Sequence, residues 1–256
     1  MGDRPFAVPE QPYAASMASR YVELRVALRA QYGVLVEALS AMDPTGPTDC
    51  AGWTVADLET HIALTARGLA RIAGHDTTEP ATGGVNEWAS QLEGLAGELD
   101  AMTKAERLSL APQSKAVDEA LADNPEDKVV EQLTGRHTLK DAVVFRLIEA
   151  VVHGLDVGIA PDPGALKIVV KELARVLAER HPGRSVEVRV PPYTAVQCVK
   201  GPRHTRGTPP NVVETEPIAW VRLCAGRLAW SEAVSDGRVR ASGERADLAG
   251  FLPLFS

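Results

Sequence analysis

The sequence predicts a protein of two domains, an all-α four-helix bundle followed by a small α+β domain. Three observations support this prediction. Long apolar segments with helical periodicity fill residues 15–160. A linker, PDPG at 161–164, then interrupts the pattern. Beyond it, residues 165–256 contain short runs of alternating polarity, which are typical of strands, among short helical stretches.

The first helix is expected over residues 15–42, after a proline-rich flexible tail formed by residues 1–14. It ends where Pro44, Gly46 and Pro47 forbid a continued helix.

The second helix, residues 55–73, begins with a clear capping pattern. Thr54 stands at the N-cap and Asp57 follows three residues later, as in a capping box. Trp53 and Leu58 occupy the two positions of a hydrophobic staple. The start of this helix is therefore fixed by local sequence.

Further helical segments complete the predicted bundle. They cover residues 86–102, 105–110, 115–121 and a long apolar helix at 139–160, with 124–136 leading into it. In the second domain we expect a helix at 165–180, strands at 185–190, 193–199 and 238–243, and helices at 218–224, 230–234 and 246–255. The polar run 201–217, GPRHTRGTPPNVVETEP, is expected to be a functional loop.

Composition excludes several classes of protein. The net charge of −7 argues against a surface that binds nucleic acid, which requires clustered positive charge. No apolar run has the length needed to cross a membrane, and the first residues lack the apolar core of a secretory signal. Three widely separated cysteines form neither a disulfide framework nor a zinc knuckle. We therefore expect a cytoplasmic protein with no nucleic-acid or membrane partner.

The helix at 139–160 carries a stripe of four ionisable residues on an otherwise apolar surface. Arg146, Glu149, His153 and Asp156 follow one another at helical spacings of three or four residues, so they share one face. Buried charge is costly unless the groups pair or hold a metal. Two interpretations remain open, a ladder of ion pairs or a metal site based on Glu149 and His153.

A third ligand comes from the second helix. His61 lies beside Ile62 on the buried face, and a single histidine there would ordinarily be structural. Together with Glu149 and His153 it completes a set of two histidines and one glutamate. Three protein ligands with an open fourth position are typical of catalytic zinc sites.

Two segments resemble a known family. GWTVADLETHIALTARGLA at 52–70 and RLIEAVVHGLDV at 146–157 are similar to the mycothiol-dependent maleylpyruvate isomerase family, which belongs to the DinB-like metal-binding four-helix bundles. The resemblance implies that His61, Glu149 and His153 are metal ligands. Residues 185–217 and 220–248 resemble the sterol-carrier-like domain that accompanies many of these bundles.

The resemblance also implies an activity. Zn²⁺ or another divalent metal would lower the pKa of a thiol, and mycothiol would be the thiol co-substrate. The thiolate would attack an electrophilic small molecule, either as a cis-trans isomerase of the maleylpyruvate type or as an S-transferase. A thiol-exchange enzyme of a biosynthetic pathway, and a non-catalytic carrier of a lipid or another small molecule, are the alternatives.

Other residues receive weaker roles. Asp156 is expected to act in catalysis and to orient a ligand imidazole or contact the thiol, although it can equally be a simple partner of His153. Trp53 is expected to contact the cofactor. Arg206 would bind a substrate carboxylate, with Arg222 and Arg240 as competitors for that role. We expect a monomer or a homodimer.

Overall fold

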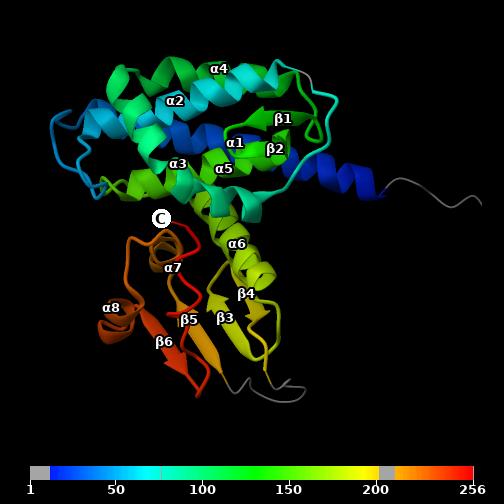
Figure 1. The fold of residues 1–256 in the computed structure, drawn as a ribbon, viewed down its shortest axis with the longest axis vertical. Coiled ribbons are helices and arrows are strands. Elements are labelled where there is room, and N and C mark those ends of the chain that lie inside the picture. The colour runs from blue at the N-terminus through cyan, green and yellow to red at the C-terminus, as the bar shows by residue number, and fades with distance from the viewer. Residues whose placement is uncertain (1–11, 76, 202–210, 256) are drawn as a thin grey trace, which may run out of the picture.

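The computed structural model describes residues 12–75, 77–201 and 211–255 (Figure 1). A helix-rich first domain is followed by a smaller α+β domain, which confirms the predicted fold class. Figure 1 shows the helices of the first domain lying together, with the sheet of the second domain below them and α6 leading from one to the other.

The first domain consists of five helices and a two-stranded hairpin among the described residues. They are α1 (Pro12–Ser40), α2 (Val55–Ala73), α3 (Val85–Ala105), α4 (Leu110–Ala122), β1 (Val129–Gln132), β2 (Gly135–Thr138) and α5 (Leu139–Leu155). Helix α1 begins at Pro12, so the predicted tail ends earlier than residue 14; its residues 1–11 lie outside the described part of the chain.

The hairpin corrects the sequence-based interpretation of residues 124–136 as a lead into a helix. Strands β1 and β2 pair antiparallel, with Val130 opposite His137. Gly135 has a φ of +104°, a conformation that favours glycine, and it begins the second strand after the turn. His137 is buried, and its Nδ1 lies 2.8 Å from the carbonyl oxygen of Gly83, which ties the hairpin to the segment before α3.

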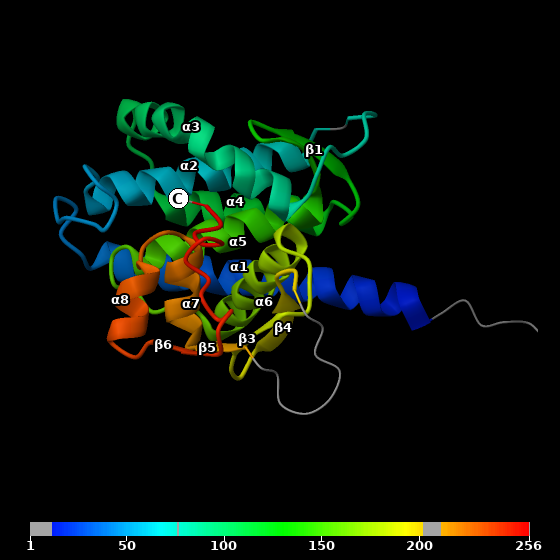
Figure 2. The ribbon, with the colours of Figure 1, turned by 60° about the horizontal axis from the view of Figure 1, so that its bottom comes forward.

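Helix α5 lies at the centre of the first domain, as its apolar circumference predicts. It contacts α1, α2 and α3 as well as α6 (Figure 2). Phe145 on α5 is fully buried and stacks on Trp88 of α3, with ring centroids 4.7 Å apart. Helix α5 is therefore packed against other helices of the molecule on several of its sides.

The second domain is built on a four-stranded sheet in the order β4-β3-β5-β6. Its elements are α6 (Pro163–Arg180), β3 (Val186–Val190), β4 (Thr194–Cys198), β5 (Val212–Thr215), α7 (Pro217–Cys224), α8 (Trp230–Ser235) and β6 (Val239–Ser242). Strand β3 pairs antiparallel with β4 and parallel with β5, and β5 pairs antiparallel with β6. Every second residue of β3 is buried, as expected for a sheet covered on one face.

Helix α6 joins the two domains. It packs against α1, α3 and α5 of the first domain and against α7 and β4 of the second. Arg180 at its end donates hydrogen bonds to the side chain and carbonyl of Asn86, to Ser90 and to the carbonyl of Leu254. The contacts fix the sheet relative to the bundle.

Two predicted elements of the second domain are wrong. The polar run 201–217 contains the strand β5, whose pairing with β3 was not evident because its partner lies far away in sequence. The predicted closing helix at 246–255 is instead a series of turns that end against α7, where Leu254 N–H donates to the carbonyl of Cys224 at 2.8 Å. Within the described residues, no helix is both long and apolar enough to cross a membrane.

Candidate functional site

The start of α2 holds His61 in place. Thr54 and Asp57 form the predicted capping box, in which each side chain accepts a hydrogen bond from the backbone N–H of the other. This fixes the first turn of α2, and His61 follows on its buried face with only 4% of its surface exposed.

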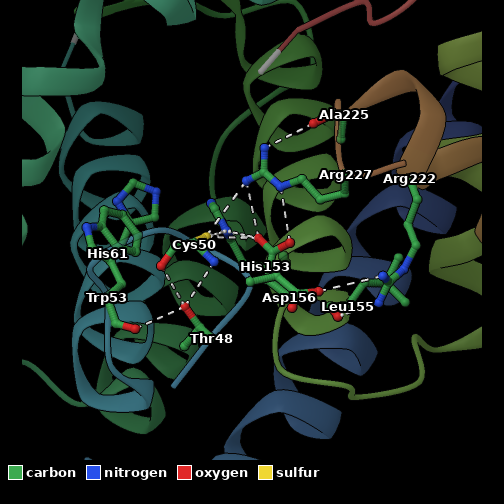
Figure 3. Close-up of polar contacts among 12 residues, drawn as sticks. Thr48, Cys50, Trp53, His61, His153, Leu155, Asp156, Arg222, Ala225 and Arg227 are labelled. Atoms are coloured by element: carbon green, nitrogen blue, oxygen red, sulfur yellow. Dashed lines mark hydrogen bonds and ion pairs between the residues drawn. The ribbon is translucent and has the colours of Figure 1, made fainter. Parts of the chain in front are cut away.

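Two histidines from separate helices meet beside a tryptophan (Figure 3). The rings of His61 on α2 and His153 on α5 lie edge to face, with centroids 5.0 Å apart. Trp53 lies 4.9 Å from the His61 ring and 6.1 Å from the His153 ring. Its indole N–H donates to Asp100 of α3 at 2.7 Å, which fixes the orientation of the ring.

His61 is kept neutral by its surroundings. Burial lowers its pKa well below the ordinary value, and the nearby His153 and Arg146 lower it further. Its Nδ1 lies 3.4 Å from Thr103 Oγ1. A neutral imidazole with one nitrogen near a hydroxyl is in the form required of a metal ligand.

Glu149 stands one turn before His153 on α5, and one of its carboxylate oxygens lacks a hydrogen bond. Glu149 Oε2 lies 2.9 Å from Arg146 Nη1, so the predicted ion pair is present. The two groups are not aligned for a hydrogen bond, and Glu149 Oε2 is a buried acceptor without a donor among the described residues. The fully buried hydroxyl of Tyr32 and the Nε of Arg146 are likewise without hydrogen-bond partners.

Asp156 connects His153 to the second domain. Its side chain is fully buried, and Oδ2 lies 3.0 Å from His153 Nδ1. Arg227, from the segment after α7, donates to Oδ1 at 3.1 Å and to Oδ2 at 3.3 Å. Burial alone would raise the pKa of Asp156, but hydrogen bonds from His153 and Arg227 hold it below its ordinary value. Asp156 therefore remains a carboxylate that orients the His153 ring.

Cys50 completes this network from the loop before α2. Its Sγ lies 3.1 Å from Asp156 Oδ2 and 3.7 Å from His153 Nδ1. Burial and the Asp156 carboxylate raise the pKa of Cys50 to about 12, although Arg227 opposes the shift. Cys50 is therefore a thiol that donates to Asp156, and it is a poor nucleophile at neutral pH.

Two sets of potential metal ligands share His153. Cys50, His153 and Asp156 are the one group of three found among the described residues whose ligand atoms all lie within 4.8 Å of one another. In that group the carboxylate is already bound by Arg227 and the cysteine is protonated. A cation placed there would meet the Arg227 charge, so we interpret this group as a hydrogen-bonded network.

The predicted set of His61, Glu149 and His153 has the chemistry of a zinc site. Its ligand atoms, however, do not all lie within 4.8 Å of one another in the structure. His61 is neutral, and His153 has one ring nitrogen on a carboxylate, which directs the other away from Asp156. Glu149 offers a buried oxygen without a hydrogen-bond donor. Two imidazoles and a carboxylate suit Zn²⁺.

The remaining predicted residues are dispersed. Trp53 lies against both histidines, and its contact with a cofactor stays a prediction. Arg206 lies outside the described residues. Arg222 donates to the carbonyl of Leu155 at 2.9 Å, close to the network. Arg240 is largely exposed on the sheet, 3.9 Å from Glu214.

Cys50 and Arg227 are functional-site residues that the sequence does not predict. The spacing of the cysteines bears only on disulfides and zinc knuckles, and Arg227 lies in a short segment without a motif. Neither is close in sequence to the stripe on α5, so periodicity could not associate them with Asp156. The one available signal was that Asp156 is a buried acid, which requires a cationic partner from elsewhere.

Replacing Arg227 with alanine should lower stability, because Asp156 would lose hydrogen bonds to a buried carboxylate. We expect a loss of about 1–3 kcal/mol in the free energy of unfolding, measured by urea denaturation. Arg240→Ala is the matched control, since it removes an arginine that is largely exposed to solvent, and it should change stability by less than about 0.5 kcal/mol. Equal stability of the two variants would contradict the structural role given to Arg227.

Comparison with known proteins agrees with this architecture. Residues 162–254 match the family described as "Bacterial SCP ortholog". Among solved structures, the chain is similar to the mycothiol-dependent maleylpyruvate isomerase, with a TM-score of 0.54 and 18% identity over 87% of this chain and 92% of that one. A mutant of that isomerase gives a TM-score of 0.55 and 17% identity with the same coverage. A comparison with curated proteins found no significant match.

The first domain carries the most extensive family match. Residues 25–158 correspond to the family described as "Mycothiol maleylpyruvate isomerase N-terminal domain". The match contains α2 and α5 complete, together with every residue of the predicted metal set. Since it spans more than half of the 256 residues, the chain belongs to the family of the mycothiol maleylpyruvate isomerase N-terminal domain.

Proposed function

We propose that this protein is a metal-dependent enzyme that uses mycothiol on an electrophilic small molecule. It would either isomerise that molecule or join mycothiol to it through the thiol sulfur. The observation that carries the proposal is the meeting of His61 and His153 from two helices, with ring centroids 5.0 Å apart. Glu149 stands one turn before His153, and its Oε2 is paired with Arg146 but accepts no hydrogen bond among the described residues. Membership of the family and the similarity to a mycothiol-dependent maleylpyruvate isomerase support it.

His61, Glu149 and His153 would hold Zn²⁺ or another divalent ion. The ion would lower the pKa of a thiol and make a thiolate available at neutral pH. Burial of the site supports this role, because charges interact more strongly where water is excluded.

Asp156 and Arg227 would position the site. The Asp156 carboxylate fixes the tautomer and the orientation of His153 through its contact at 3.0 Å. Arg227 brings the second domain against Asp156, which also contacts His153 (Figure 3). Trp53 would cover the site from the side of the loop and exclude water from it.

The isomerase and the transferase begin with the same event. The thiolate sulfur forms a bond to one carbon of a polarised double bond, and the π electrons move to the neighbouring carbon and its carbonyl. In the isomerase, rotation about the resulting single bond is followed by loss of the thiolate, which restores the double bond. In the transferase, the carbanion takes a proton and the sulfur stays attached.

Removal of the metal tests the proposal. We expect that dialysis against a chelator will abolish turnover, that added Zn²⁺ will restore it, and that no turnover will occur without mycothiol. The measurements are loss of free thiol with a panel of alkylating electrophiles, and the change in ultraviolet absorbance as cis-dienoates isomerise. Undiminished turnover by the metal-free protein would contradict the proposed chemistry.

A further inference from the structure

A cavity of about 420 Å³ opens between α2, α3 and the β1–β2 hairpin. His61, Arg146 and Glu149 form part of its lining, so it adjoins the predicted metal ligands. The volume lies within the range of ordinary small-molecule sites, roughly 300–1,000 Å³. Because an engineered apolar cavity of about 150 Å³ already holds benzene, this one can take a larger molecule.

The walls of the cavity are mainly apolar. They are formed mainly by aliphatic side chains of α2 and α3, among them Leu64, Leu69, Ile72, Leu92, Leu95 and Leu99. Trp88, which is fully buried, also lines it.

Cations that could bind a carboxylate are scarce in this cavity. Among the described lining residues, Arg71 and Arg146 carry a positive charge. Arg146 is already paired with Glu149 at 2.9 Å, and Arg71 is exposed. A small dicarboxylate would therefore leave the apolar walls unfilled and, in the metal-free protein, meet a pre-formed ion pair.

Two lining residues are unusually exposed. Leu133 at the hairpin turn has 58% of its surface accessible, and Met102 on α3 has 42%. Both belong to the cavity lining, so an apolar ligand would remove their side chains from water. Exposed apolar groups at the edge of an apolar cavity are typical of a ligand site.

We propose that this cavity binds an apolar body, aromatic or aliphatic, of the electrophile, with its reactive carbon directed toward His61 and Glu149. The inference rests on the proposed function for the identity of the reacting groups. In a thiol addition, sulfur would bond to the β-carbon of an α,β-unsaturated ketone, the π electron pair would move to the α-carbon, and water would supply the proton there. The substrate class is thus an apolar unsaturated carbonyl compound.

The test uses an unreactive ligand so that binding is measured apart from chemistry. The probe is 4-phenyl-2-butanone, the saturated analogue of a reactive enone, titrated calorimetrically into the full-length, metal-free protein. Maleate is the polar comparison. We expect the ketone to bind at least about tenfold more tightly than maleate.

Gly68 provides a variant that fills the cavity without disturbing the fold. It lies on α2 in the lining, and a Cβ added there would meet nothing within 4 Å. Gly68→Leu should therefore weaken ketone binding at least about tenfold while Tm is maintained or rises, since glycine disfavours a helix. Gly33→Leu on α1 is the matched control, because its Cβ also meets open space and Gly33 lies outside the lining.

The outcomes separate this inference from the proposed function. Ketone binding that is unchanged in Gly68→Leu, or maleate binding as tightly as the ketone, would overturn the assignment of the cavity. Ketone binding that is lost in Gly68→Leu, in a protein that with mycothiol neither consumes thiol nor isomerises any cis-dienoate, would support the cavity and overturn the thiol chemistry. Turnover of dicarboxylates without measurable ketone binding would support the thiol chemistry and overturn the assignment of the cavity.

Discussion

Replacing His153 with alanine is expected to abolish stoichiometric zinc binding while the protein remains helical. His153 belongs to both sets of potential metal ligands, and its loss leaves two ligands in either. Removal of a ligand should exceed the roughly 10–100-fold loss of affinity caused by changes around a metal site. The measurements are zinc content by atomic emission after dialysis and circular dichroism in the far ultraviolet.

Two further variants decide which set holds the metal. Cys50→Ser should retain zinc if His61, Glu149 and His153 are the ligands, and should lose it if Cys50 is a ligand. His75→Ala is the matched control for loss of an imidazole, since His75 is exposed just beyond the end of α2. Normal zinc content in His153→Ala would remove His153 from the site.

The helices of the first domain could be predicted where local signals and periodicity agreed. Helix α2 has the predicted bounds because its capping box and its apolar face both lie within one stretch of sequence. Helix α5 ends at Leu155, earlier than predicted, because Asp156 becomes its C-cap and turns follow. The ion-pair ladder, one of the two interpretations of its charged stripe, is present, since Arg146 pairs with Glu149 and His153 with Asp156.

Elements that depend on distant partners were not predictable in the same way. The hairpin consists of two four-residue strands whose alternation is too short to be distinguished from a loop. Strand β5 is equally short and depends on β3 for its pairing. The apolar run at 246–255 has helical spacing, yet Pro253 and contacts with α7 keep it in turns.

The candidate site likewise contains residues that periodicity predicts and a contact that depends on a distant partner. His61, Glu149 and His153 were selected because each lies on a helical face that periodicity identifies as buried, and the structure brings the two histidines together. Arg227 reaches Asp156 only through the packing of one domain on the other. Contacts between domains leave no periodic signal in a single sequence. The contact of Arg227 with Asp156 is therefore visible only in the structure.

The final prediction tests whether a thiol enters the site. Zinc has no visible spectrum, so the protein is prepared with cobalt in its place. If His61, Glu149 and His153 leave a coordination position open, addition of mycothiol should produce a new near-ultraviolet absorption band, and proton release should accompany it, because metal coordination deprotonates a thiol. The band should require less mycothiol than a simple thiol, since the sugar portion adds contacts.

Loss of the band in His61→Ala would tie it to the predicted ligands, because His61 lies outside the network of Cys50 and Asp156. His75→Ala again serves as the control and should retain the band. A non-catalytic carrier, or a metal closed off by four protein ligands, offers no position for sulfur. A cobalt spectrum that does not respond to mycothiol or to any simple thiol would therefore contradict thiol activation, even in a protein that binds cobalt stoichiometrically.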